Sequence, residues 1–281
     1  AMGRNQAGRS EEGHDPTNGM QPTNSNVGQE EAVAGLPEET TYTHETKHKV
    51  ARREAPQVTA SDHEIEVRTE WGPLLSHTAD VRARVDEATL SYGAGSTLFS
   101  LDGVFSPVEC KRLIHAAEAI GFGYTDYLKA YRGNLRLITV DQSLTDVVWG
   151  RLKGMVPPMV ELDGYEWRAC GLNECWRLAK YSPGDRFGAH CDANFKRNAC
   201  EISMFTVNVY MNSVHPEHGG ATRFYGGSNA RTEPRLVVQP EAGLAVLFRQ
   251  PPGAALLHDG EELAGGEKFL FRSDVMYRRV Q

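Results

Sequence analysis

The feature that most constrains the fold is a succession of short apolar runs in the second half of the chain. The runs with the length and composition of β-strands are 174–182, 201–211, 221–225, 235–238, 243–249, 254–258 and 267–277. Turn-forming sequences such as Ser182-Pro183-Gly184 and Pro251-Pro252-Gly253 separate them, because Gly and Pro supply the backbone angles of tight turns. This spacing, after a helical start, predicts helices packed on a two-sheet barrel or jelly roll.

Two helices are predicted ahead of these strands. Ser106-Pro107-Val108-Glu109 combines an N-cap hydroxyl, a first-turn proline and a glutamate three residues after the cap, which together form a capping box. The apolar residues that follow have the spacing of one buried helix face, and Gly121 to Gly123 end the helix. A second helix is expected from about Leu144 to Met155, where Pro157-Pro158 stops it.

The first part of the chain differs from the rest in composition. Residues 1–60 are rich in Gly, Asn, Thr, Glu and Gln and nearly lack aromatic residues, so burial cannot offset the entropy lost on ordering them. We expect a flexible N-terminal arm there and one domain at 61–281, in which 61–96 adds edge strands. The fold class is α+β, mainly β, with helical support at about 97–160 and a jelly-roll core at about 165–280.

Composition and charge exclude several classes of protein. Acidic and basic residues are mixed along the 281 residues, and the formal net charge is -7, so nucleic acid is not an expected partner. No apolar run reaches the roughly 18 to 20 residues of a membrane helix. Five cysteines without a C-x-x-C pair favour free thiols, and we expect a cytoplasmic or nuclear protein without a membrane partner. The opening Ala1-Met2-Gly3 is typical of a cloning remnant. Removal of a targeting segment from the natural protein is therefore an open alternative.

A metal site is indicated by His190-Cys191-Asp192, where an imidazole and a carboxylate stand two residues apart. On a strand both side chains leave the same face. His258 follows a later apolar run, which an antiparallel pairing can bring alongside. Two histidines and one carboxylate on one face of a metal are typical of non-haem Fe(II) oxygenases, although zinc hydrolysis uses the same ligand types.

Lys268 adds a second signal. It lies on a predicted strand where Lys268, Leu270, Arg272 and Asp274 alternate onto one face. A cation among apolar neighbours is costly unless it meets an anion, and the distal carboxylate of 2-oxoglutarate would be that anion. A solvated lysine on an edge strand is the alternative.

Several motifs in order resemble the 2-oxoglutarate/Fe(II) dioxygenase superfamily, and within it the prolyl 4-hydroxylase-like branch. The resemblance covers about 97–280. The segments that carry it are VFSPVECKRLI, GLNECWRLAKYSPGDRFGAHCDANF, GGATRFY, PEAGLAVLF and LLHDGEELAGGEKFLFRSDVMYRR. It implies a double-stranded β-helix, also called a jelly roll or cupin-like fold, with Fe(II) as metal, 2-oxoglutarate and O₂ as cosubstrates, and ascorbate as a candidate further cofactor.

The resemblance also implies residue roles. The iron ligands, and hence the catalytic residues, would be His190, Asp192 and His258. The residues implied for the cosubstrate are Lys268, Tyr181, Thr206 and Arg272, and Arg272 is also a candidate for a substrate carboxylate. Relatives often carry an aromatic residue where this chain has Asp274, which leaves the substrate open.

The segment 123–140 is predicted to form a substrate-facing loop. Candidate substrate residues are Arg132, Asn134, Arg136 and Asn173, with solvated surface, or for Asn173 a turn, as the alternative. The expected reaction is hydroxylation of a carbon centre, with release of succinate and CO₂. The first candidate substrate is a prolyl or other amino-acid side chain in a peptide; the alternatives are a free amino acid or other small metabolite, and a non-enzymatic metal-binding barrel.

Overall fold

The computed structural model describes residues 63–76, 78–84, 97–254 and 256–280. All of these residues belong to one compact unit. The arm predicted at 1–60 lies outside the described residues. Among the helices that are described, none has the length and apolar character needed to cross a membrane.

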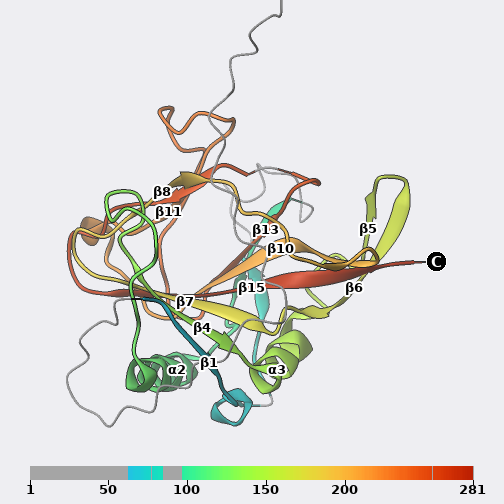
Figure 1. The fold of residues 1–281 in the computed structure, drawn as a ribbon, viewed down its shortest axis with the longest axis horizontal. Coiled ribbons are helices and arrows are strands. Elements are labelled where there is room, and N and C mark those ends of the chain that lie inside the picture. The colour runs from blue at the N-terminus through green and yellow to red at the C-terminus, as the bar shows by residue number, and fades with distance from the viewer. Residues whose placement is uncertain (1–62, 77, 85–96, 255, 281) are drawn as a thin grey trace, which may run out of the picture. The chain divides into compact units, whose positions relative to one another are not determined.

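Two β-sheets form the body of the domain (Figure 1). The path of the large sheet is β1 (Ile65–Arg68), β4 (Leu135–Val140), β7 (Cys175–Tyr181), β15 (Lys268–Arg279), β10 (Glu201–Tyr210), β13 (Ala245–Arg249), β3 (Leu98–Asp102) and β2 (Arg82–Arg84). Three strands pair beside this path: β5 (Met159–Leu162), β6 (Tyr165–Leu172) and β9 (Lys196–Asn198). The small sheet has the order β12 (Leu236–Val238), β11 (Thr222–Phe224), β14 (His258–Gly260) and β8 (Phe187–His190). This mainly β architecture confirms the expected jelly-roll fold.

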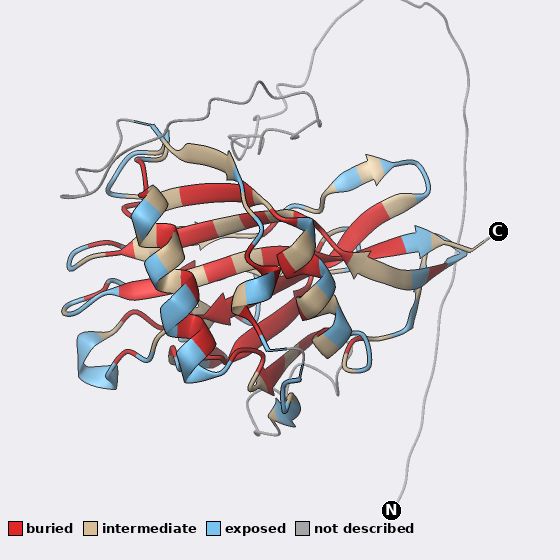
Figure 2. Cartoon of the chain, turned by 90° about the horizontal axis from the view of Figure 1, so that it is seen from below, coloured by how far each residue is buried: buried red, intermediate tan, exposed pale blue. Residues whose placement is uncertain are grey.

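Strand alternation places apolar residues on both faces of the large sheet, where they form separate core clusters. On β13, Ala245 and Leu247 belong to the core that the helices cover, whereas Val246 and Phe248 belong to the core shared with the small sheet. Figure 2 shows the buried stretches in the middle of the strands and the exposed residues in the turns and on the outer faces of the helices. Because successive side chains point to opposite faces, the same alternation directs polar residues of β10 and β15 into the space between the sheets.

The helices form where the capping signals predict them. α2 (Pro107–Ile120) has the full capping box, with the Ser106 hydroxyl accepting from the Glu109 amide and the Glu109 carboxylate accepting from the Ser106 amide. It ends at Gly121, whose φ of 99° lies in the region that favours glycine. α3 (Gln142–Leu152) begins earlier than predicted, because the Asp141 side chain caps it through the Leu144 amide at 2.8 Å.

A buried ion pair joins the two helices on the outer face of the large sheet. Arg151 Nη2 of α3 lies 2.7 Å from Glu109 Oε1 of α2, and the two side chains are only 3% and 5% exposed. Burial opposes ionisation, but hydrogen bonds from Arg151 and from the amides of Ser106 and Ser76 lower the pKa of Glu109 to about 2. The pair is therefore charged at neutral pH, and removing one partner would leave a buried charge unpaired.

Most of the predicted strands are present, and the differences have local causes. The run predicted at 254–258 is wrong as a strand, because the chain is still in a turn at 251–253 and β14 begins only at His258. Within 97–160, β3, β4 and β5 accompany the two helices. Sequence reasoning also missed the short strand β9, and of the strand assumed at His190-Cys191-Asp192 only His190 lies in β8. β1 and β2 stand at the two ends of the large sheet's path, as expected for edge strands.

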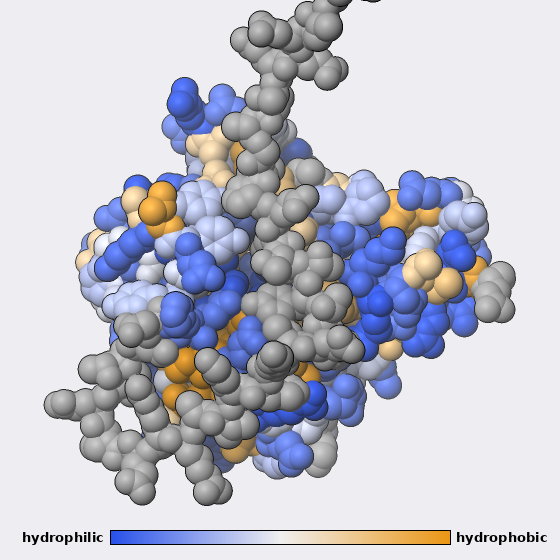
Figure 3. Space-filling model, viewed as in Figure 1, coloured by the Kyte–Doolittle hydropathy of each residue, from blue (hydrophilic) through white to orange (hydrophobic). Residues whose placement is uncertain are grey.

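The described residues form no large apolar patch on the face that Figure 3 shows. Figure 3 shows a mainly hydrophilic face where described residues are visible, with apolar residues in separate spots. Among the residues that the structure describes, the large apolar side chains that are exposed are Val108, Tyr124, Leu128, Met159, Tyr165 and Val237. They come from separate segments, as is normal for single exposed hydrophobic residues.

Candidate active site

Two histidines meet on neighbouring strands of the small sheet. The register of β8 and β14 pairs His190 with His258, and their ring centroids are 4.3 Å apart. Each Nδ1 lies 2.9 Å from a backbone carbonyl, that of Gly188 for His190 and that of Leu256 for His258. Because a carbonyl oxygen only accepts, each Nδ1 carries the proton and each Nε2 keeps a free lone pair.

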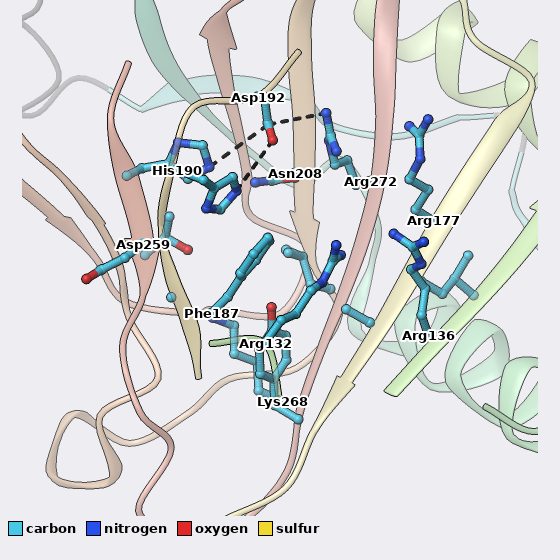
Figure 4. Close-up of a pocket in the computed structure, with 17 residues that line it drawn as sticks. Arg132, Arg136, Arg177, Phe187, His190, Asp192, Asn208, Asp259, Lys268 and Arg272 are labelled. Atoms are coloured by element: carbon cyan, nitrogen blue, oxygen red, sulfur yellow. Dashed lines mark ion pairs between the residues drawn. The ribbon is translucent and has the colours of Figure 1, made fainter. Parts of the chain in front are cut away.

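Asp192 completes the group directly after β8. Its Oδ1 lies 3.5 Å from His190 Nε2 and its Oδ2 lies 4.0 Å from His258 Nε2. One ligand atom from each of the three residues lies within 4.8 Å of the others (Figure 4). Two imidazoles and one carboxylate converging in this way fit a single divalent metal ion with open coordination positions.

The protonation states also suit a metal. Burial alone would raise the pKa of Asp192, but the Arg272 guanidinium and the two imidazoles hold that pKa well below its usual range. Burial, with a contribution from His190, lowers the pKa of His258 to about 4. At neutral pH the site therefore contains a carboxylate and a neutral imidazole, the forms that bind metal ions.

A ring of buried polar side chains holds Asp192 in place. The Thr206 hydroxyl donates to Asp192 Oδ2 at 2.8 Å, and the Gln250 amide donates to Thr206 Oγ1 at 2.9 Å and to Asp274 Oδ1 at 2.8 Å. Arg272 closes the ring, with Nη2 3.4 Å from Asp192 Oδ2 and 3.7 Å from Asp274 Oδ1. The free oxygen, Oδ1, is the one that faces His190. Such partners of a ligand fix its orientation.

The three ligand residues face a cavity lined from both sheets, with a volume of about 580 Å³ including its mouth. Figure 4 shows Lys268 at the opposite end from the His–Asp–His group. Lys268 is 2% exposed, its Nζ donates to the Gly220 carbonyl at 2.6 Å, and it lies 5.0 Å from the Tyr181 ring centroid. Burial lowers the pKa of Lys268 to about 8, although Glu261 and Asp259 partly oppose this. A buried ammonium that lines a cavity suits a carboxylate ligand.

One buried polar atom between these ends lacks a partner. Asn208 Oδ1 makes no hydrogen bond within the described parts of the chain, although Asn208 is 5% exposed and lines the cavity. Buried polar atoms are normally hydrogen-bonded. An unsatisfied acceptor beside the ligand residues therefore fits a cavity that is built to hold a polar group.

Most of the residues predicted for the site line this cavity. They are His190, Asp192, His258, Lys268, Tyr181, Arg272, Arg132 and Arg136. Arg136 comes from β4, so the segment predicted as a substrate-facing loop is part loop and part strand.

Three predicted residues lie elsewhere. Thr206 was expected to contact the cosubstrate, but its buried hydroxyl is taken up by Asp192. Asn134 does not line the cavity; its Oδ1 accepts from Arg132 Nε at 3.2 Å. Asn173 lies in the turn between β6 and β7, where its Oδ1 accepts from the Cys175 amide at 3.1 Å.

Sequence reasoning missed several lining residues, including Phe187, Asn208, Arg177 and Asp259. Phe187 stacks on His190 with 3.8 Å between ring centroids, yet nothing in the sequence separates it from an ordinary core aromatic. Asn208 did carry a signal, since it is a polar residue on the apolar strand β10, two positions after Thr206 and on the same face.

The comparisons with known proteins bear on this geometry. Residues 176–273 match the family model of the 2OG-Fe(II) oxygenase superfamily, a span that includes the three ligand residues and Lys268. A sequence search among curated proteins finds no match.

Similar solved structures include prolyl hydroxylases. The viral collagen prolyl hydroxylase of Paramecium bursaria Chlorella virus-1 in complex with 2-oxoglutarate is 19% identical, with a TM-score of 0.46 over 66% of this chain and 97% of that one. A prolyl-4-hydroxylase of Pseudomonas putida is 17% identical, with a TM-score of 0.45 over 69% and 98%. A Trichoplax adhaerens prolyl hydroxylase in complex with a hypoxia inducible factor peptide is 12% identical, with a TM-score of 0.47 over 67% and 87%.

The family match and the donor set define a non-haem iron oxygenase that depends on 2-oxoglutarate. Over residues 176–273 the chain is similar to the 2OG-Fe(II) oxygenase superfamily. Its cofactor is Fe(II), and its cosubstrates are 2-oxoglutarate and O₂.

Proposed function

We propose that the enzyme hydroxylates a carbon centre of an amino-acid side chain in a peptide or protein, with a prolyl side chain as the first candidate. One observation carries the proposal: the His190–Asp192–His258 group and Lys268 stand at opposite ends of one cavity. The prolyl choice rests on the order of motifs that resemble the prolyl 4-hydroxylase-like branch, described above.

In this proposal His190, Asp192 and His258 hold the iron. Both imidazoles present Nε2, because their Nδ1 atoms are bonded to the carbonyls of Gly188 and Leu256. Thr206 and Arg272 fix the carboxylate of Asp192. The chain thus supplies three ligands and leaves the remaining coordination positions for cosubstrate and O₂.

Lys268 binds the far carboxylate of 2-oxoglutarate. The ammonium is buried beside Tyr181, so the ion pair forms away from water. The carboxylate supplies the negative charge that balances the buried ammonium. Burial raises the pKa of Tyr181 to about 12, so its phenol stays neutral and does not compete as an anion.

The bound iron and cosubstrate supply the oxidising chemistry: one atom of O₂ enters the substrate C–H bond as a hydroxyl, and the other enters succinate as 2-oxoglutarate loses CO₂. The protein positions the substrate and excludes water. Phe187, stacked against His190, covers one side of the ligand group with an apolar ring. This ring limits where a substrate carbon can approach.

A free amino acid or other small metabolite is the second candidate substrate. The observation in its favour is Arg132, which is 9% exposed and lines the cavity. A buried guanidinium suits a compact anionic substrate that enters the cavity entirely.

The test is succinate release by the purified protein with Fe(II), 2-oxoglutarate, O₂ and ascorbate, with and without pooled peptides and pooled amino acids. We expect one pool to stimulate release in the wild type and in His215→Ala, a histidine with a 64% exposed side chain outside the site, and not in His190→Ala. Stimulation by the amino-acid pool alone would replace the peptide proposal with the small-molecule one. Equal succinate release by wild type and His190→Ala would contradict the ligand assignment.

A further inference from the structure

Arg132 is held against the strand that carries His190. The Gly133 amide donates to the Arg186 carbonyl at 2.9 Å, and the Gly188 amide donates to the Tyr131 carbonyl at 2.6 Å. A Cβ on Gly188 would lie 2.4 Å from the Tyr131 ring, and one on Gly133 would lie 2.6 Å from Asp185. Glycine at both positions therefore allows the close approach that places Arg132 in the cavity.

The Arg132 side chain is buried, and its contacts fix the orientation of the guanidinium. Its guanidinium carbon lies 4.3 Å from the centroid of the Phe187 ring and 5.2 Å from that of Tyr127. Its Nε donates to Asn134 Oδ1 at 3.2 Å. The two aromatic contacts and the Nε bond position the guanidinium, which Figure 4 shows beside Phe187 in the cavity. The Nη groups are left to bind a ligand in the plane of the guanidinium.

The other arginines of the cavity have carboxylate partners. Arg136 pairs with Glu64, Arg177 with Asp274 at 3.5 Å, and Arg272 with Asp192 at 3.4 Å. The remaining lining carboxylate, Asp259, is bound by Arg223 at 2.7 Å and by the Tyr225 hydroxyl at 2.8 Å.

Arg132 differs from these arginines. Within residues 63–76, 78–84, 97–254 and 256–280, no carboxylate lies within ion-pair distance of Arg132. Arg132 is nonetheless buried, with only 9% of its surface exposed. Arginine stays charged in proteins, and a buried cation without an anion is strongly unfavourable. The position therefore calls for an anionic ligand.

The cosubstrate does not supply that anion under the proposed function, because one carboxylate of 2-oxoglutarate goes to the iron and the other to Lys268. We propose that Arg132 binds a carboxylate of the substrate, so that the substrate is an acid whose reacting C–H bond is close to that carboxylate. The closeness follows from Phe187, because its ring contacts both Arg132 and His190. This inference rests on the proposed function and narrows its substrate class.

The carboxylate can come from a free amino acid or from an acidic side chain of a peptide, and paired probes separate the two. The 281-residue protein is loaded with Mn(II) and 2-oxoglutarate, and binding is measured by calorimetry and by the shift in thermal unfolding. The probes are the twenty free L-amino acids with their α-amides, and blocked tripeptides with a central Asp or Glu with their Asn and Gln counterparts. The titrations are run without O₂, so the readout is binding alone.

We expect at least one acid to bind the wild type roughly 10- to 100-fold more tightly than its amide, as for hydrogen bonds to charged groups. Arg132→Gln should abolish this difference and leave the affinity for 2-oxoglutarate unchanged. Arg82→Gln removes an arginine whose side chain is 74% exposed, and this control should keep the preference. The probe set that shows the preference identifies the source of the carboxylate.

Three results would overturn the proposal. The first is equal binding of every acid and its amide by the wild type. The second is Arg132→Gln keeping the acid preference. The third is that Arg132→Gln lowers the affinity for 2-oxoglutarate instead, which would show that Arg132 binds the cosubstrate. Failure of the wild type to bind Mn(II) and 2-oxoglutarate would be seen before any acid is added, and it would refute the proposed function itself.

Discussion

Thr206→Val tests whether the polar ring around Asp192 serves the metal. Valine has nearly the shape of threonine but lacks the hydroxyl that donates to Asp192 Oδ2 at 2.8 Å. The substitution also removes the acceptor for the Gln250 amide, which keeps its second bond to Asp274 at 2.8 Å. The structure therefore predicts two effects, one on the metal ligand and one on folding.

The effect on metal affinity and the effect on the free energy of unfolding can be estimated separately. Loss of a partner that orients a ligand typically weakens metal binding about 10- to 100-fold, or about 1.4 to 2.7 kcal/mol. A buried donor left short of an acceptor costs about 1 to 3 kcal/mol in the free energy of unfolding. Thr206→Ser is the matched control, because it keeps the hydroxyl and loses only a methyl group, at about 0.5 to 1.5 kcal/mol.

Anaerobic Fe(II) titration gives the metal dissociation constant, and urea unfolding gives the stability. We expect Thr206→Val to weaken Fe(II) binding while Thr206→Ser retains it, even if both are less stable. Unchanged Fe(II) affinity in Thr206→Val would refute the orienting role. A weaker affinity for 2-oxoglutarate with unchanged Fe(II) affinity would instead restore the contact with the cosubstrate that the sequence suggested.

Three further predictions concern charge and packing. Burial lowers the pKa of Lys268 to about 8, so the ammonium predominates below that pH. Calorimetry should therefore show that the affinity for 2-oxoglutarate is constant below about pH 8 and falls by up to about tenfold per pH unit above it. In Lys268→Met the affinity should be weak and independent of pH. Glu109→Gln should cost about 3 to 5 kcal/mol by urea unfolding at pH 7, because it leaves Arg151 unpaired. The folded-state pKa of Glu109, about 2, is below its ordinary 4.5, so wild-type stability should fall from about pH 4.5 towards pH 2 while the variant loses less. Gly243→Ala should destabilise by about 2 to 5 kcal/mol, since its φ is +84° and a Cβ would lie 2.0 Å from the Phe105 carbonyl oxygen, whereas Gly154→Ala, with open space around it, should be neutral. Equal stability of the two alanine variants, or of Glu109→Gln and wild type, would contradict the packing and ion-pair arguments, and a flat pH profile would contradict the Lys268 argument.

Local patterns were enough to predict the helices and most strands. The capping box at Ser106 and the alternation of β10, β13 and β15 are encoded within a few residues. They can therefore be predicted without knowing which elements pack against them. The ligand pair His190 and Asp192 was equally local. His258 needed the order of the motifs, because its pairing with His190 depends on the register of β8 with β14.

The rest of the site depends on register that the sequence does not display. Thr206 pairs with Asp274 across β10 and β15, and this pairing, with Gln250 beyond the end of β13, creates the ring that holds Asp192. Likewise an isolated bridge pairs Arg132 with Phe187. Contacts between a loop and a short strand leave no periodic signal, so the burial of Arg132 could not be predicted.

The assignment of His190 and His258 as iron ligands can be tested by anaerobic binding of Fe(II) and 2-oxoglutarate to the wild type, His190→Ala, His258→Ala and the control His215→Ala. We expect one Fe(II) and one 2-oxoglutarate per chain in the wild type and in the control. Both ligand variants should lose Fe(II) binding. Stoichiometric Fe(II) binding that persists in His190→Ala and His258→Ala would refute the assignment, because the metal would then be held elsewhere.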